Sequence, residues 1–173
     1  MLRKILLPAA LLAGLALPLA ACADDTPAKT KAAAPDKLAA GQYEVTAKVT
    51  SFRSTDGKTP LIAAKVGDLI TTRACVGADG TPSAELFQTT GDQCTTTNPY
   101  FSGGSINVTL DCTRKSVRGK IMVNVDGSTT ADGLTGRLTT TTFIDGPGDY
   151  ELKAAMTGKR TGACSAGPAP TGA

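Results

Sequence analysis

SINVTLDC, residues 105–112, and KIMVNVD, residues 120–126, decide the fold of this chain. In both stretches apolar side chains alternate with polar ones, which is typical of a β-strand with one face in a core and the other in water. The inward positions would be Ile106, Val108, Leu110 and Cys112 in the first stretch, and Ile121, Val123 and Val125 in the second. The two stretches therefore predict neighbouring strands that share one buried face.

The same alternation recurs over residues 43–49, 134–142 and 150–156. Residues 69–76 and 94–101 are weaker candidates whose threonines favour extended structure, and we expect at most one helical turn, near residues 83–87. Turn-forming residues separate these segments: Asp56-Gly57, Asp79-Gly80, Gly103-Gly104, Asp126-Gly127, Asp132-Gly133 and Gly146-Pro147-Gly148. We predict an all-β domain, an antiparallel meander of about seven strands that forms a curved sheet or a small up-and-down barrel.

The N-terminus has the form of a lipoprotein signal. Arg3 and Lys4 precede a run rich in Leu and Ala that ends in LAAC, residues 19–22. A basic start, an apolar stretch and small residues are typical of a cleaved secretory signal, and the cysteine after the small pair resembles the bacterial lipobox. That resemblance implies cleavage before Cys22 and a lipid on its thiol. The alternatives are an ordinary signal cleaved elsewhere and a membrane-spanning helix, which the prolines and glycine in the run disfavour.

Composition divides the chain into four parts. Residues 1–21 are the predicted lipoprotein signal peptide, and residues 22–40 are the lipidated cysteine and a flexible tether rich in Ala, Lys, Pro and Asp. Residues 41–164 are the β-domain, and residues 165–173 are a disordered tail. We expect a cell-envelope protein bound to the membrane through the lipid on Cys22. The residues after Cys22 resemble the sorting signals of outer-membrane lipoproteins, which implies an outer-membrane protein facing the periplasm.

The remaining cysteines are Cys75, Cys94, Cys112 and Cys164. Four cysteines in an exported domain predict two disulfides. If residues 102–104 form a three-residue hairpin loop, the register pairs Tyr100 with Ile106 and Cys94 with Cys112, both cysteines on the buried face. Cys75 then pairs with Cys164 by elimination. Because no pair has C-x-x-C spacing and the chain has no histidine, we expect no metal site and no cofactor.

The charge and the residue types of the chain disfavour nucleic-acid binding and catalysis. Without Arg3 and Lys4 the mature chain carries 16 basic and 15 acidic residues, a net charge of +1, which disfavours nucleic-acid binding. Nucleophilic catalysis usually needs a histidine base, so we expect no enzyme and no catalytic residue. Single carboxylates on the wet faces of strands are expected to be solvated charges: Glu44, Asp68, Glu85, Asp111 and Glu151. The acidic stretches 126–133 and 145–149 lack the ligand spacing of an EF-hand calcium loop.

Several short stretches resemble one family. They are GQYEVT at 41–46, RACV at 73–76, LDC at 110–112 and GKRTGAC at 158–164. In these the chain is similar to the bacterial domain of unknown function 3617, whose members are small exported proteins, often with four such cysteines. It departs from that pattern at Tyr43, where tryptophan is common, and over residues 77–82. The resemblance implies no reaction, substrate or cofactor.

We therefore expect a non-catalytic binding or interaction module, whose partner is an envelope protein or a small apolar ligand. One alternative is a carrier that holds a small apolar molecule inside a β-barrel. The other is a histidine-free hydrolase, built on a serine and a lysine.

Overall fold

The computed structural model describes residues 35–130 and 133–164. These residues form seven strands and one short 3-10 turn, η1 (Ala84–Leu86). The strands are β1 (Gly41–Ser54), β2 (Leu69–Val76), β3 (Asp92–Ser102), β4 (Ser105–Arg114), β5 (Gly119–Thr130), β6 (Gly133–Ile144) and β7 (Tyr150–Gly162). The all-β prediction is confirmed, as is each of the seven predicted strands. In this part of the chain, no helix has the length and apolar character needed to cross a membrane.

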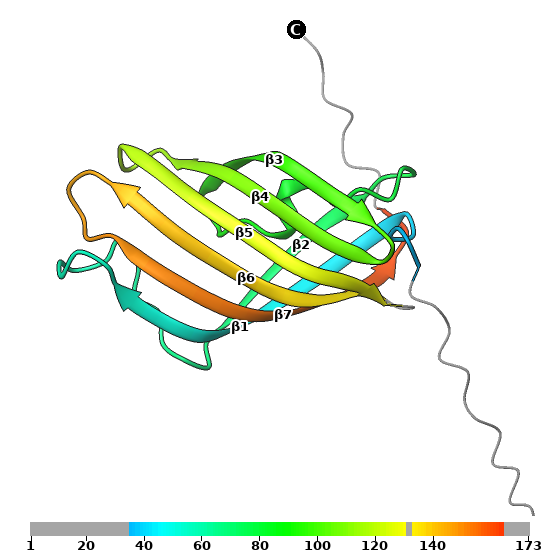
Figure 1. Ribbon diagram of the computed structural model, residues 1–173, viewed down its shortest axis with the longest axis horizontal. Helices are drawn as coiled ribbons and strands as arrows, with labels where there is room; N and C mark the ends of the chain where they lie inside the picture. The colour runs from blue at the N-terminus through cyan, green and yellow to red at the C-terminus, as the bar shows by residue number, and fades with distance from the viewer. Residues whose placement is uncertain (1–34, 131–132, 165–173) are drawn as a thin grey trace, which may run out of the picture. The chain divides into compact units, whose positions relative to one another are not determined.

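All seven strands belong to one antiparallel sheet with the order β2-β1-β7-β6-β5-β4-β3. Every strand pairs with its neighbour in sequence except β2 and β3, and β1 also pairs with β7. The sheet therefore curls into a half-barrel with one open junction, between β2 and β3, which we call the seam (Figure 1). The η1 turn lies in the connection between these two strands and contacts both of them as well as β1.

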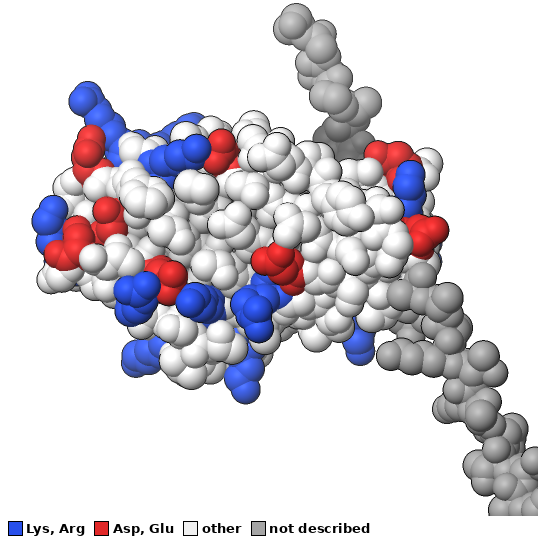
Figure 2. Space-filling model, viewed as in Figure 1, with Lys and Arg blue, Asp and Glu red and all other residues white. Residues whose placement is uncertain are grey.

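The inner face of the half-barrel holds the core. Its fully buried side chains come from six of the seven strands and η1, and they include Tyr43, Val49, Val76, Leu86, Ile106, Leu110, Val123, Leu134, Tyr150 and Met156. Polar residues alternate with them on the outer face. Figure 2 shows one side of the molecule, where uncharged side chains cover a broad area and basic and acidic side chains are interspersed around it.

The turn between β3 and β4 is shorter than predicted. The paired residues Ser102 and Ser105 enclose only Gly103 and Gly104, so the predicted three-residue loop is wrong. Both glycines have positive φ, 57° and 75°, as the tight two-residue hairpin turn requires.

A bulge in β3 nevertheless restores the predicted register near the cysteines. Tyr100 faces Asn107, one residue away from its predicted partner, but the register shifts between residues 97 and 100. Asn98 in this interval has a φ of 49°, and the extra residue on β3 offsets the shorter turn. Beyond it Cys94 faces Cys112, as predicted.

The predicted turn at Asp126-Gly127 is also wrong, because both residues lie inside β5. Gly127 is paired with β4 on one side and with Gly136 of β6 on the other. A Cβ atom on Gly136 would lie 2.7 Å from the Cα atom of Gly127. This glycine pair therefore lets two strands approach closely instead of turning the chain. At the predicted Asp132-Gly133 turn, Gly133 begins β6 and Asp132 lies outside the described residues.

Both predicted disulfides are present. Cys94–Cys112 joins facing residues on the inner face of the β3–β4 hairpin, with Cα atoms 4.0 Å apart. Cys75–Cys164 joins edge strand β2 to the residue that follows β7, with Cα atoms 5.7 Å apart. Because β1 lies between β2 and β7 in the sheet, the second disulfide ties together three strands.

The two disulfides should differ in their contribution to stability. The bond Cys75–Cys164 spans 89 residues and the bond Cys94–Cys112 spans 18, and loop-closure entropy assigns them about 4–5 and about 3 kcal/mol. We expect Cys75→Ala/Cys164→Ala to lower the free energy of unfolding in urea by more than Cys94→Ala/Cys112→Ala does. Equal losses, or a larger loss for the second variant, would contradict this account.

Candidate functional site

The chain enters the half-barrel across one of its rims. We call this the tether rim; it carries residues 35–40, the start of β1 and the end of β7. The side chains of Thr129, Tyr43 and Arg160 donate hydrogen bonds to the carbonyls of Pro35, Ala39 and Ala40, respectively. Leu38 is only 5% exposed and belongs to the core. Residues 35–40, assigned from sequence to the tether, are thus packed on the domain, and Leu38 is the apolar residue that makes this possible.

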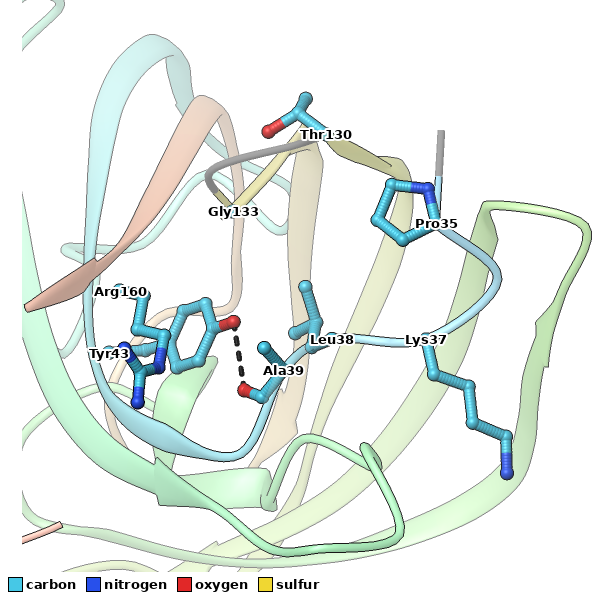
Figure 3. A pocket seen from close by; sticks show the side chains of 8 residues that line it. All are labelled: Pro35, Lys37, Leu38, Ala39, Tyr43, Thr130, Gly133 and Arg160. Atoms are coloured by element: carbon cyan, nitrogen blue, oxygen red, sulfur yellow. Dashed lines mark hydrogen bonds between the residues drawn. The ribbon is translucent and has the colours of Figure 1, made fainter. Parts of the chain in front are cut away.

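A pocket of about 490 Å³ lies at the tether rim (Figure 3). Burial raises the pKa of the Tyr43 hydroxyl, and the Arg160 charge opposes that rise. The hydroxyl already donates to the Ala39 carbonyl at 3.0 Å, and the Arg160 Nε donates to the Ala40 carbonyl at 2.8 Å. In Figure 3 the Lys37 side chain extends away from Tyr43 and Arg160. The polar groups of this pocket therefore hold the incoming chain instead of converging on one point.

A second pocket opens at the seam, near the opposite rim. We call that rim, with the β1–β2 connection over residues 55–68, the loop rim. The pocket, of about 380 Å³, has Ile70 of β2 on one side of the seam and Thr89, shortly before β3, on the other. Its inner wall includes Val49 and Leu152, which are 1% and 2% exposed and belong to the core. This seam pocket therefore connects the open junction of the sheet with its apolar inner face.

One strongly exposed aliphatic residue, Leu69, lies at the seam pocket. It lines the pocket and is 66% exposed. Residues 62–64 also line a neighbouring hollow of about 470 Å³ beside Phe52. The connection is fixed to the β6–β7 loop, since the Gly148 N–H donates to the Thr59 carbonyl at 2.7 Å.

A charged pair lies on the inner face at the loop rim. Asp92 and Arg114 face each other across the β3–β4 ladder, and the Arg114 Nε lies 2.6 Å from an Asp92 carboxylate oxygen. Their side chains are 1% and 14% exposed, respectively. The charges of this pair also act on the hydroxyl of Tyr150, whose pKa is raised mainly by burial; Arg114 lowers this pKa and Asp92 raises it.

The carboxylates considered from the sequence are scattered over the described residues. Glu44, Asp111 and Glu151 form ion pairs with Arg73, Lys120 and Arg53, respectively. Asp68 lines the seam pocket and Glu85 lies in η1. In residues 35–130 and 133–164, no three His, Cys, Asp or Glu side chains gather as a metal site.

One carboxylate in each of the two acidic stretches makes hydrogen bonds within the sheet or its hairpins. The Asp149 carboxylate accepts hydrogen bonds from the Thr142 hydroxyl and the Ile144 N–H, which fixes the β6–β7 hairpin. Asp126 accepts a hydrogen bond from Asn107 on the neighbouring strand.

Sequence reasoning missed the inner pair of Asp92 and Arg114. The signal was available, because the register that pairs Cys94 with Cys112 also places Asp92 opposite Arg114 on the same face. Cys22, the signal peptide and the tail lie outside the described residues.

The packing of the incoming segment depends on Leu38. We expect Leu38→Ala to lower the free energy of unfolding by about 2–3 kcal/mol, because it removes a buried aliphatic side chain, and to speed protease cleavage near residue 38. Lys37→Ala is the matched control, since Lys37 is exposed, and should leave both measurements unchanged. A Leu38→Ala variant as stable as the control would show that the segment is not part of the packed unit.

Comparison with known proteins places this domain in a family. Neither the curated proteins nor the solved structures gave a significant match. Residues 38–164 match the family described as "Protein of unknown function (DUF3617)". The match begins at Leu38, the buried residue of the incoming segment, and ends at Cys164, the last disulfide cysteine. Since it covers most of the sequence, the chain belongs to the DUF3617 family.

Proposed function

We propose that this protein is a lipid-anchored protein of the cell envelope, and that its half-barrel is a non-catalytic module that binds a small apolar molecule at the seam pocket. The observation that carries the binding role is the seam pocket itself. It opens between β2 and β3, which are not joined by hydrogen bonds. Most of its lining residues are aliphatic, and they include the core residues Val49 and Leu152. Its volume of about 380 Å³ lies within the usual range for small-molecule sites.

The sequence around Cys22 supports the lipid anchor. LAAC at residues 19–22 follows a basic start and an apolar run. With residues 35–40 packed on the domain, residues 23–34 connect the anchor to the tether rim. Fully extended, such a segment spans at most about 40 Å. The anchor would therefore keep the half-barrel close to the membrane, where apolar molecules are concentrated.

A protein partner that adds a strand to the sheet is the competing role, and the β3 edge does not favour it. Strand addition needs a regular edge with free N–H and C=O groups. The bulge at Asn98 interrupts β3, and the next residue, Pro99, has no N–H to donate. Bulges and prolines are features that prevent pairing at exposed edges. We therefore favour the pocket over the β3 edge as the binding surface.

The lipid anchor is tested by replacing Cys22. In a bacterial host that processes lipoproteins, the unchanged chain should fractionate with membranes, and its intact mass should show a diacylglycerol on Cys22. Cys22→Ala should lose the lipid mass and leave the membrane fraction. An unchanged chain without lipid on Cys22 would exclude this mode of attachment.

The pocket is tested with N-phenyl-1-naphthylamine, a neutral apolar dye whose fluorescence rises on binding. We expect saturable binding, and a loss of affinity of about tenfold in Ala64→Phe, because the added ring occupies the seam pocket. Ala155→Phe makes the same change on the exposed face of β7 and should bind the dye as the parent does. Absence of saturable binding, or equal affinities of the two variants, would refute the site.

A further inference from the structure

We propose that the ligand of the seam pocket is an amphiphilic carboxylic acid, and that its carboxylate is bound by the Arg114 guanidinium and the Tyr150 hydroxyl. This inference rests on the proposed function and names the chemical class of the ligand. It follows from two buried hydrogen-bonding atoms that have no partner among the described residues, from the positive charge of Arg114, and from the position of both side chains beside the pocket.

The first atom is Nη2 of Arg114. The Asp92 carboxylate pairs with the neighbouring Nε atom at 2.6 Å. Nη2 is buried and has no hydrogen-bond partner among the described residues. A guanidinium can donate five hydrogen bonds and matches a carboxylate in geometry. Arg114 is therefore held in place by Asp92 while one of its buried donors remains available.

The second atom is the hydroxyl of Tyr150. This side chain is 1% exposed, and its hydroxyl likewise has no partner in the part of the chain that is described. Burial raises the pKa of this hydroxyl, and a protonated tyrosine hydroxyl can donate a hydrogen bond. Arg114 and Asp92 are both near enough to affect this pKa. The two free donors thus belong to one polar group on the inner face of the sheet.

Tyr43 provides a comparison on the same face of the sheet. It is also almost fully buried, at 2% exposed, but its hydroxyl donates to the Ala39 carbonyl at 3.0 Å. Buried polar groups normally have such partners, because desolvation without a hydrogen bond is unfavourable. Tyr150 departs from this rule, and a ligand oxygen would supply the missing partner.

Two connections place the polar group beside the seam pocket. Tyr150 lies two residues before Leu152 on the inner face of β7, which separates their Cα atoms by about 7 Å. The Asp92 N–H donates to the Thr89 carbonyl at 3.0 Å, and both Leu152 and Thr89 line the pocket. A molecule with its hydrocarbon part in the seam pocket would therefore have its head group near Arg114 and Tyr150.

The surroundings of Arg114 suit a charged head group. Arg114 also lines an open hollow of about 330 Å³ at the loop rim, together with Gly91 and Lys115. Water can reach a charge from this side, which lowers the cost of bringing a carboxylate to a buried arginine. The second cation, Lys115, adds to the attraction for an anion. A neutral apolar molecule would leave both free donors without a partner.

Calorimetric titration with octanoate and octan-1-ol tests the inference, since these probes share a chain and differ in the head group. We expect octanoate to bind at least about tenfold more tightly. Tyr150→Phe should remove most of that preference and leave octanol binding unchanged. Tyr43→Phe, the matched control, should keep the preference. Arg114→Lys, which preserves a cation beside Asp92, should reduce the preference as well and provides a second variant.

The outcomes separate the two proposals. Equal binding of octanoate and octanol, or a preference that Tyr150→Phe and Arg114→Lys both retain, would overturn the carboxylate site and leave the apolar pocket standing. Failure of both probes to bind the parent protein would overturn the proposed function together with this inference. A preference for octanoate that falls in both variants and persists in Tyr43→Phe would support both.

Discussion

The absence of a ladder between β2 and β3 is the constraint on which the rest of this structure depends. Six hydrogen-bonded strand pairs form a curled sheet whose inner face encloses the core. The edge strands β2 and β3 are not paired with each other, so residues outside the strands must cover the core between them. The η1 turn packs at this junction, and Leu86 fills part of the interior. Nearer the loop rim the cover consists of residues 62–64 and Thr89, and there the seam pocket reaches the core.

The two rims of the half-barrel use their polar groups differently. At the tether rim, Tyr43 and Arg160 bind backbone carbonyls of the incoming chain, and Leu38 fills the space beneath. At the loop rim, Asp92, Arg114 and Tyr150 form a buried polar group whose hydrogen-bonding capacity the described residues do not satisfy. Since a buried ion pair adds little net stability, the second arrangement is the one to which the proposed carboxylate ligand is assigned.

Local patterns in the sequence were sufficient for the strands, because period-two alternation identifies the inner face. They also placed Cys94 and Cys112 on that face, where they form a disulfide, and Cys75–Cys164 followed by elimination. They were not sufficient for features set by neighbouring strands. The bulge at Asn98 offsets the short glycine turn, and Gly127 is explained only by the close approach of Gly136. The seam pocket joins residues from β1, β2, β7 and two connections, so no single stretch of sequence contains its signal.

We propose the seam as the route to an interior binding site. The most direct measurement is a map of backbone amide chemical shifts, recorded by NMR as octanoate is added to the ¹⁵N-labelled domain. The account predicts saturable shifts that concentrate at the seam pocket and the polar group beside it, at Ile70, Thr89, Tyr150 and Leu152. Shifts confined to the tether rim or to the outer face of the sheet, with none at these four residues, would contradict it.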